Sequence, residues 1–241
     1  MTSTVASLAE RYPATLLLFA MLLGADALFI LVHAVHAWSP YLGDSKYALD
    51  ADLGMAELYQ YIKLLWLLGC LTLAFWQTRR GVFIAWAAFS ALLLLDDAAQ
   101  LHENAGRLMA KGLGLASAFG LRGVDYGELM FAAGVGVVGL AVVVVTLRQG
   151  SREARQLSLD MAVMLSVLAV FAVLGDVAHS FAYNRAPALI DVLALVEDGG
   201  ELLVVSAITA YAFDIASNSG RQRIGVWDWV RNRSPRTRGN P

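Results

Sequence analysis

Six apolar segments of about 20 residues each dominate the sequence. A helix of that length crosses the hydrocarbon core of a bilayer, and it satisfies all its own backbone hydrogen bonds there. The composition agrees, because 58% hydrophobic and 16% charged residues make a 241-residue chain too apolar for an ordinary soluble domain. The sequence therefore predicts an all-α integral membrane protein. Its six transmembrane helices are expected near residues 13–36, 55–77, 81–101, 127–147, 158–182 and 188–214.

The distribution of Lys and Arg predicts the orientation. If the N-terminus is cytoplasmic, 12 of the 18 basic residues fall on the inner side and five on the outer side, which fits the positive-inside rule. We therefore expect a multi-pass protein of the cell membrane with both termini in the cytoplasm. Residues 1–217 form the predicted six-helix domain, and residues 218–241 form a basic cytoplasmic tail. The tail has arginines beside Trp227 and Trp229. We therefore expect it to bind membrane lipid and not nucleic acid.

The acidic residues are distributed the opposite way. Fifteen of the 20 Asp and Glu residues lie in the outer halves of the predicted helices or beyond them, as do all four histidines. An ionised side chain at the centre of a membrane helix costs about 3 kcal/mol, so such residues persist mainly where they face a bundle interior or bind something. The sequence therefore predicts a functional site that opens to the outside.

A repeated pattern suggests how the helices are grouped. Residues 125–129 and 198–202 share the pattern D-x-G-E-L, and the first, third and fifth helices carry Asp26, Asp97 and Asp176 toward their outer halves. Membrane proteins often build a central site from repeats. We expect three tandem helical hairpins around an outward-facing polar cavity. The alternative is a chance similarity in an apolar sequence of low complexity.

Four residues form the predicted metal-binding set. Asp176 and His179 are three apart and share one helix face, as metal ligands in D-x-x-H pairs do. Glu201 is the ligand expected from the last helix and His102 the ligand expected from the end of the third. Imidazole and carboxylate ligands suit Zn, Fe or Mn, and the site is rich enough in oxygen for one or two divalent ions.

Several interpretations of this cluster stay open. A single histidine near the membrane interface is usually a hydrogen-bonded structural residue, and we interpret His33 and His36 in this way. The larger set is different, because many carboxylates at one depth repel each other unless some are protonated or a metal neutralises them. Four explanations of these clustered carboxylates stay open: metal binding, a proton or cation path, structural pairing and an organic cofactor.

Two features of the spans predict contacts. Lys63 is the only lysine within a predicted helix, and we expect it to form an ion pair with Asp26 or Asp97. A retinal Schiff base at Lys63 is disfavoured, because the chain has six predicted helices where a microbial rhodopsin has seven. The pair Gly199 and Gly200 in the last helix predicts a close approach by a neighbouring backbone or a ligand.

The leading functional hypothesis is a membrane-embedded metalloprotein. It would be a metal-dependent hydrolase or oxidoreductase for a small lipid-soluble substrate, with Asp97 or Glu197 as the general base. The alternative is a cation- or proton-coupled transporter or channel lined by carboxylates. The sequence disfavours this alternative, because a path needs polar groups throughout the membrane and the inner halves of the helices are mostly Leu, Val and Ala.

Overall fold

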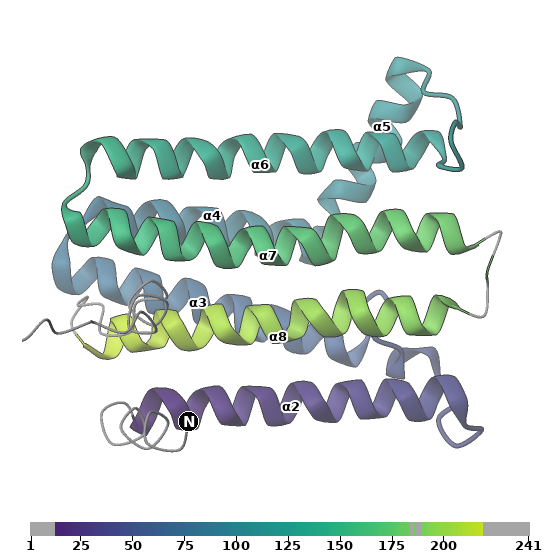
Figure 1. The fold of residues 1–241 in the computed structure, drawn as a ribbon, viewed down its shortest axis with the longest axis horizontal. Coiled ribbons are helices and arrows are strands. Elements are labelled where there is room, and N and C mark those ends of the chain that lie inside the picture. Colours follow the sequence, from purple (N-terminus) through teal and green to yellow (C-terminus); the bar gives the residue numbers. More distant parts are fainter. Residues whose placement is uncertain (1–12, 184–185, 187–188, 219–241) are drawn as a thin grey trace, which may run out of the picture.

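The computed structural model describes residues 13–183, 186 and 189–218, and the named elements of this part of the chain are all helices (Figure 1). The six long helices run side by side, and a short helix projects from one end (Figure 1). The long helices are α2 (Pro13–Trp38), α3 (Met55–Thr78), α4 (Gly81–Ala99), α6 (Gly123–Gln149), α7 (Arg152–Tyr183) and α8 (Ile190–Ser217). The short elements are the 3₁₀-helix η1 (Ser45–Tyr47) and α5 (Leu101–Leu113).

Five of these helices, α2, α3, α4, α6 and α7, are long and apolar enough to cross a membrane. The prediction of an all-α chain of membrane type is confirmed to this extent. The sixth predicted span, α8, is not among the five. It carries five carboxylates, which are Asp191, Glu197, Asp198, Glu201 and Asp214. The predicted tail lies outside the described residues from residue 219 onward.

α8 occupies the centre of the bundle. It packs against α2, α3 and α7, while α3 also packs against α4, and α6 packs against α5 and α7. The large buried side chains at these contacts include Leu67 and Leu71 of α3, Trp86 of α4, Met161 of α7 and Ile208 of α8. Of the three predicted hairpins, α7 and α8 pack closely along their length, whereas α2 packs chiefly on α8. The threefold repeat stays a prediction.

The two ends of the bundle differ in their connections. We call the end that carries α5, where α7 finishes and α8 begins, the α5 end, and the end where α2 begins and α8 finishes the terminal end (Figure 1). The α3–α4 and α6–α7 turns lie at the terminal end. All six long helices therefore run from one end to the other.

The third predicted span, 81–101, ends two residues early at a corner between α4 and α5. Gln100 adopts the left-handed conformation (φ 47°), and its N–H donates to the carbonyl oxygens of Asp96 and Asp97. The Asn104 side chain donates to the Ala99 and Gln100 carbonyls, and the Asp96 carboxylate accepts the His102 N–H at 2.8 Å. These side chains satisfy backbone groups that a helix terminus leaves open. The corner therefore forms without a Gly or Pro.

Glycines allow the closest helix contacts. Gly106 of α5 and Gly127 of α6 face each other, so that a Cβ atom on Gly127 would overlap the Gly106 carbonyl. Gly200 does allow a close approach, but by the Phe171 ring of α7 and not by the predicted backbone or ligand, since a Cβ there would overlap that ring. Gly199 meets Ile30 of α2 at ordinary contact distance.

We predict that Gly127→Ala destabilises the protein by about 1–3 kcal/mol, because the new methyl group must displace the α5 backbone. The matched control is Gly134→Ala on the same helix, where a Cβ would meet no atom within 4 Å. This control should leave stability unchanged or raise it slightly, since Ala favours helix more than Gly does. Thermal unfolding in detergent measures both. Equal effects of the two substitutions would show that the α5–α6 contact is looser than described.

Candidate functional site

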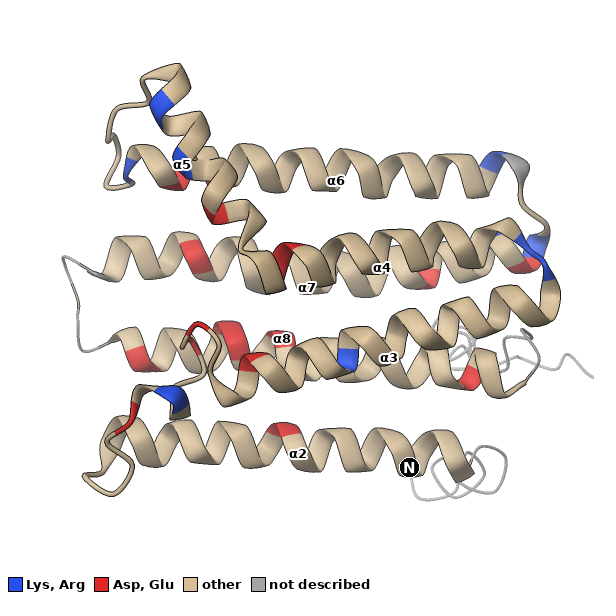
Figure 2. Ribbon diagram, turned by 180° about the vertical axis from the view of Figure 1, so that it is seen from behind, with Lys and Arg blue, Asp and Glu red and all other residues tan. Residues whose placement is uncertain are grey.

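Acidic residues gather at the α5 end of the bundle, whereas basic residues gather at the α3–α4 and α6–α7 turns of the terminal end (Figure 2). Three basic side chains at the α5 end are paired with acids of their own segments. Arg107 lies 2.9 Å from Glu103, Arg122 lies 2.7 Å from Asp125, and Lys46 lies 2.9 Å from Asp44. Within the described residues these cations therefore form no ion pair with the deeper carboxylates of α7 and α8.

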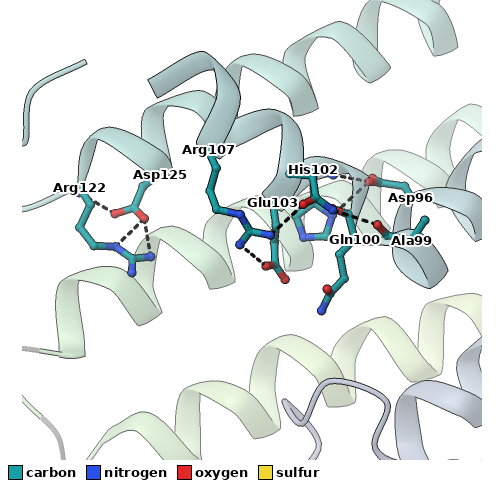
Figure 3. A network of polar contacts seen from close by, with 9 residues as sticks. Asp96, Ala99, Gln100, His102, Glu103, Arg107, Arg122 and Asp125 are labelled. Atoms are coloured by element: carbon teal, nitrogen blue, oxygen red, sulfur yellow. Dashed lines mark hydrogen bonds and ion pairs between the residues drawn. The ribbon is translucent and has the colours of Figure 1, made fainter. Parts of the chain in front are cut away.

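His102, a predicted metal ligand, is held by Asp96 (Figure 3). Its Nδ1 lies 3.1 Å from the Asp96 carboxylate, which also accepts its backbone N–H. The hydrogen bond to Asp96 raises the pKa of His102 to about 9, although burial opposes the shift. His102 is therefore cationic at neutral pH, and an imidazolium cannot ligate a metal until it loses a proton.

The second predicted histidine ligand, His179, is held by Glu197. His179 Nδ1 of α7 lies 3.1 Å from Glu197 Oε2 of α8. Gly175, one turn earlier on α7, makes room for this contact, because a Cβ there would overlap the Glu197 side chain. Glu197, one of the two predicted general bases, thus already has a partner. Asp176 lies within electrostatic range of Glu197, Glu128 and His102.

Glu201, the last predicted ligand, contacts Gln60 of α3. Gln60 Nε2 donates to Glu201 Oε2 at 3.2 Å, and the Gln60 side chain is buried. Among the residues that the structure describes, its buried carbonyl oxygen, Oε1, has no hydrogen-bond partner, and the same holds for Oδ2 of Asp198. Glu201 also lies within electrostatic range of Asp198, Asp97, Glu197 and Asp176. The carboxylates at this level are therefore close enough to repel one another when ionised.

The predicted metal set does not converge on one point. Across residues 13–183, 186 and 189–218, no group of three or more His, Cys, Asp or Glu side chains is arranged to hold a metal ion. His102 pairs with Asp96, His179 with Glu197, and Glu201 with Gln60. Metal binding therefore stays a prediction, as do the catalytic roles of Asp97 and Glu197. Asp97 lies in the last turn of α4, and its backbone carbonyl accepts the Tyr61 hydroxyl at 3.2 Å.

The other two histidines are structural, as predicted. His33 is buried, accepts the Leu49 N–H at Nδ1 and faces the Asp191 carbonyl at Nε2, each at 3.1 Å. His36 bonds the Leu42 carbonyl through Nδ1 at 2.6 Å. Both therefore fasten the α2–α3 connection to the bundle.

A buried ion pair lies deeper than the carboxylate cluster. Lys63 of α3 lies 2.9 Å from Asp26 of α2, and both side chains are 0% exposed, which confirms one of the two predicted partners. The ammonium also donates to the Leu202 carbonyl at 2.7 Å and to Ser206 Oγ at 3.2 Å, and Ser206 Oγ donates to Asp26 at 2.6 Å. The sequence analysis missed the α8 partners, because their position opposite Lys63 depends on how α8 is rotated and shifted against α3.

Buried polar groups continue toward the terminal end. Thr209 Oγ1 donates to the Lys63 carbonyl at 3.3 Å, Tyr211 donates to Asp160 at 3.1 Å, and Thr15 donates to Asp214 at 3.1 Å. Asp160, Thr209 and Asp214 are each no more than 1% exposed. The inner halves of the helices contain few polar residues, but several of these are buried and contact α8.

Comparison with known proteins assigns the chain to a family. The family described as Domain of unknown function (DUF8692) matches residues 13–215. The chain belongs to this family. The match begins at the first residue of α2 and ends two residues before the end of α8, so the family covers nearly all of the described bundle. No curated protein and no solved structure matches the chain.

We predict that the His102–Asp96 pair makes stability depend on pH. The pKa of His102 is higher in the folded chain than its ordinary value of 6.5. The stabilisation that protonated His102 gives the folded state is therefore complete below pH 6.5 and is lost as the pH rises through about 9. Wild type should therefore lose thermal stability relative to Asp96→Asn as pH rises from 6.5 to about 9. Unfolding temperatures in detergent at several pH values measure this. A difference between the two proteins that stays constant with pH would contradict the prediction.

Proposed function

We propose that the chain is a proton- or cation-coupled membrane transporter whose path follows α8. The observation that carries this proposal is the line of buried polar groups along that helix. Glu201 is bonded to Gln60, Ser206 joins the Lys63–Asp26 pair, and Asp214 is bonded to Thr15. A path across a membrane needs such groups at every depth, and ionisable residues inside a membrane bundle typically mark proton relays or ion pathways.

The proposal includes α8 as the sixth transmembrane helix. Its carboxylates are compatible with a span, because α2, α3 and α7 surround it and keep its polar face away from lipid. The terminal end would face the cytoplasm, since Arg79, Arg80, Arg148 and Arg152 lie at the turns there. Both termini would then be cytoplasmic, and the carboxylate cluster would face outward. The threefold hairpin repeat, with one acid from each odd span, is a further part of this proposal.

The position of the carboxylates supports entry of the transported ion from the outer side, at the α5 end. Carboxylates at the α5 end attract cations and protons from that side, and the deeper Lys63 and Asp26 balance each other's charge. Within the described residues, Asp97, Asp176, Asp198 and Glu201 form no salt bridge with Lys or Arg, so a bound proton or cation would relieve their repulsion. The cluster is therefore suited to collect the ion that the path carries.

One arrangement favours a second function, a metal-dependent enzyme acting on a small lipid-soluble substrate. Asp176 lies within electrostatic range of Glu197, Glu128 and His102, which brings three carboxylates and an imidazole to the same region. His102, Asp176, His179 and Glu201 would bind one or two Zn, Fe or Mn ions, with Asp97 or Glu197 as the base. Both histidines would first have to leave their carboxylate partners.

For the transport proposal, we predict that purified protein in lipid vesicles dissipates an imposed gradient of protons or cations, and that Glu201→Gln abolishes this flux. The substitution keeps the shape of the side chain but removes the group that can take up and release a proton. The matched control is Glu153→Gln, which changes an exposed glutamate paired with Arg80 at the terminal end. Flux that is absent in wild type, or unaffected by Glu201→Gln, would overturn the proposal.

For the metalloenzyme, we predict that protein purified in detergent without chelator contains at least one equivalent of Zn, Fe or Mn by elemental analysis. Asp176→Asn should lower this content, because it removes a predicted ligand. Protein that is nearly free of metal, and that takes up none when the three ions are added, would remove this second function.

A further inference from the structure

The short helix α5 and the turn that follows it expose large apolar side chains at one end of a bundle whose long helices are of membrane-spanning type. We propose that α5 and this turn lie on the bilayer surface at the α5 end, with their apolar side chains in contact with lipid and the charged face of α5 in water. The partner is the phospholipid leaflet itself, and apolar contact holds α5 there. This inference holds whether or not the chain is a transporter.

α5 lies at the level where a span enters the membrane. It packs against the first two turns of α6, because Gly106 fits against Gly127 and the backbone of Glu128. The segment Gly123–Arg148 of α6 is long and apolar enough to cross a membrane. α5 runs crosswise to the long helices and projects beyond α6 (Figure 1, Figure 2). The projecting part of α5 therefore lies over the lipid that surrounds α6.

α5 carries its charged and apolar residues on different faces. The charged face is marked by Glu103, Arg107 and Lys111, which recur every four residues. The apolar face contains residues 101, 105, 108 and 112, which follow the spacing of an amphipathic helix. Leu108 and Leu113 are 72% and 60% exposed, although both are large apolar side chains. A strongly amphipathic helix of low overall hydrophobicity typically lies in the plane of the membrane interface.

The turn after α5 exposes a third large apolar side chain. Ala118 and Leu121 exchange two backbone hydrogen bonds, of 3.1 and 3.0 Å, across Phe119 and Gly120. Both central residues are left-handed, with φ of 52° and 89°, in a kind of turn where Asn-Gly is usual and a bulky residue is rare. The Tyr126 hydroxyl of α6 fixes the turn by donating to the Ala118 carbonyl at 2.8 Å. Phe119 is thus held at the tip with 89% of its surface exposed.

These exposed residues continue the apolar surface of α6. Met130, Val137 and Leu140 of α6 are exposed along that helix, as side chains in contact with lipid are. Because α5 rests on the first turns of α6, its own exposed side chains extend this surface to the level of the lipid headgroups. Lipid around α6 occupies the space that another protein would need to cover the same face of α5.

The charges of α5 indicate which class of lipid suffices. Arg107 lies 2.9 Å from Glu103, and Arg122 lies 2.7 Å from Asp125, so both guanidinium groups are balanced within the chain. Lys111 is exposed on the charged face and adds a weak attraction to anionic headgroups. A leaflet of zwitterionic phospholipid is therefore sufficient to hold α5.

The test uses the full chain in vesicles of zwitterionic phospholipid, with Cys70→Ser to remove the only native thiol. A nitroxide label is attached to one new cysteine at a time. Its accessibility to oxygen, which concentrates in lipid, is compared with its accessibility to a water-soluble nickel chelate present on both sides of the membrane. Leu108→Cys and Phe119→Cys should each give an oxygen-to-nickel ratio about threefold or more above that of Arg107→Cys, the matched control on the charged face.

Leu140→Cys on α6 calibrates the scale, because this exposed residue lies within a span. Its ratio should exceed that of Leu108→Cys, since oxygen increases and the nickel chelate decreases with depth in the bilayer. Leu108 and Phe119 are exposed, so their replacement leaves the packing of the bundle intact. Replacing a third of the lipid by anionic phospholipid should change the ratios by less than about twofold.

Three outcomes would overturn the inference. Ratios at positions 108 or 119 that equal the ratio at position 107 would place that part of the surface in water. A label at position 108 that neither reagent reaches would show that a second copy of the chain or another protein covers the face. A ratio at position 108 that rises only when anionic lipid is present would show that charge, and not apolar contact, holds the helix.

Discussion

A lysine ammonium and an aspartate carboxylate that are completely shielded from solvent determine how the centre of this bundle must be built. Removing such ions from water costs several kcal/mol each even after relaxation, so the pair is stable only if its hydrogen-bonding capacity is fully used. The ammonium of Lys63, which belongs to α3, uses all its donors, because acceptors on α2 and α8 surround it. A shift of any of these helices along its axis would leave a buried charge without a partner. The ion pair therefore sets the register of three helices at once.

The same requirement explains why the most acidic helix is the central one. α2, α6 and α7 expose large apolar side chains over much of their length, among them Leu17, Val137 and Leu174, as helices in contact with lipid do. α8 instead directs Ser206, Thr209 and Asp214 into the bundle, where other helices supply partners. Gly200 lets α7 approach closely, which helps to enclose α8. A helix with this many polar groups is stable in a bilayer only in such a position.

At the α5 end, the pairing of imidazoles with carboxylates decides what the cluster can do. His102 is held by Asp96 and His179 by Glu197, so neither is a vacant metal ligand. The remaining carboxylates lie near one another around Glu201. A site with engaged histidines and repelling carboxylates favours uptake of protons over ligation of a borderline metal such as zinc. This arrangement is the reason for proposing transport ahead of metalloenzyme chemistry.

Sequence reasoning located the helices well, because the apolar length that a bilayer demands is a local property. The second span was expected at 55–77 and is Met55–Thr78. The third was expected to reach residue 101 but ends at Ala99, since Asn104 and Asp96 cap the two helix ends at that corner through contacts that composition does not reveal. The structural roles of His33 and His36, and the partnership of Lys63 with an acid, were also predictable from residue type and position.

By itself, the sequence determined that the chain is helical and apolar, that its charges are sorted between two ends, and that its titratable groups are concentrated near one depth. Only the tertiary structure decided which groups meet. The residues His102, Asp176, His179 and Glu201 lie toward the same end of the bundle, but they belong to three helices, α5, α7 and α8, and the rotation of each helix about its axis sends the two imidazoles to different carboxylates. Ser206 and the Leu202 carbonyl reach Lys63 for the same reason. Helix rotation and register follow from packing across the whole bundle, and no single segment of sequence contains that information.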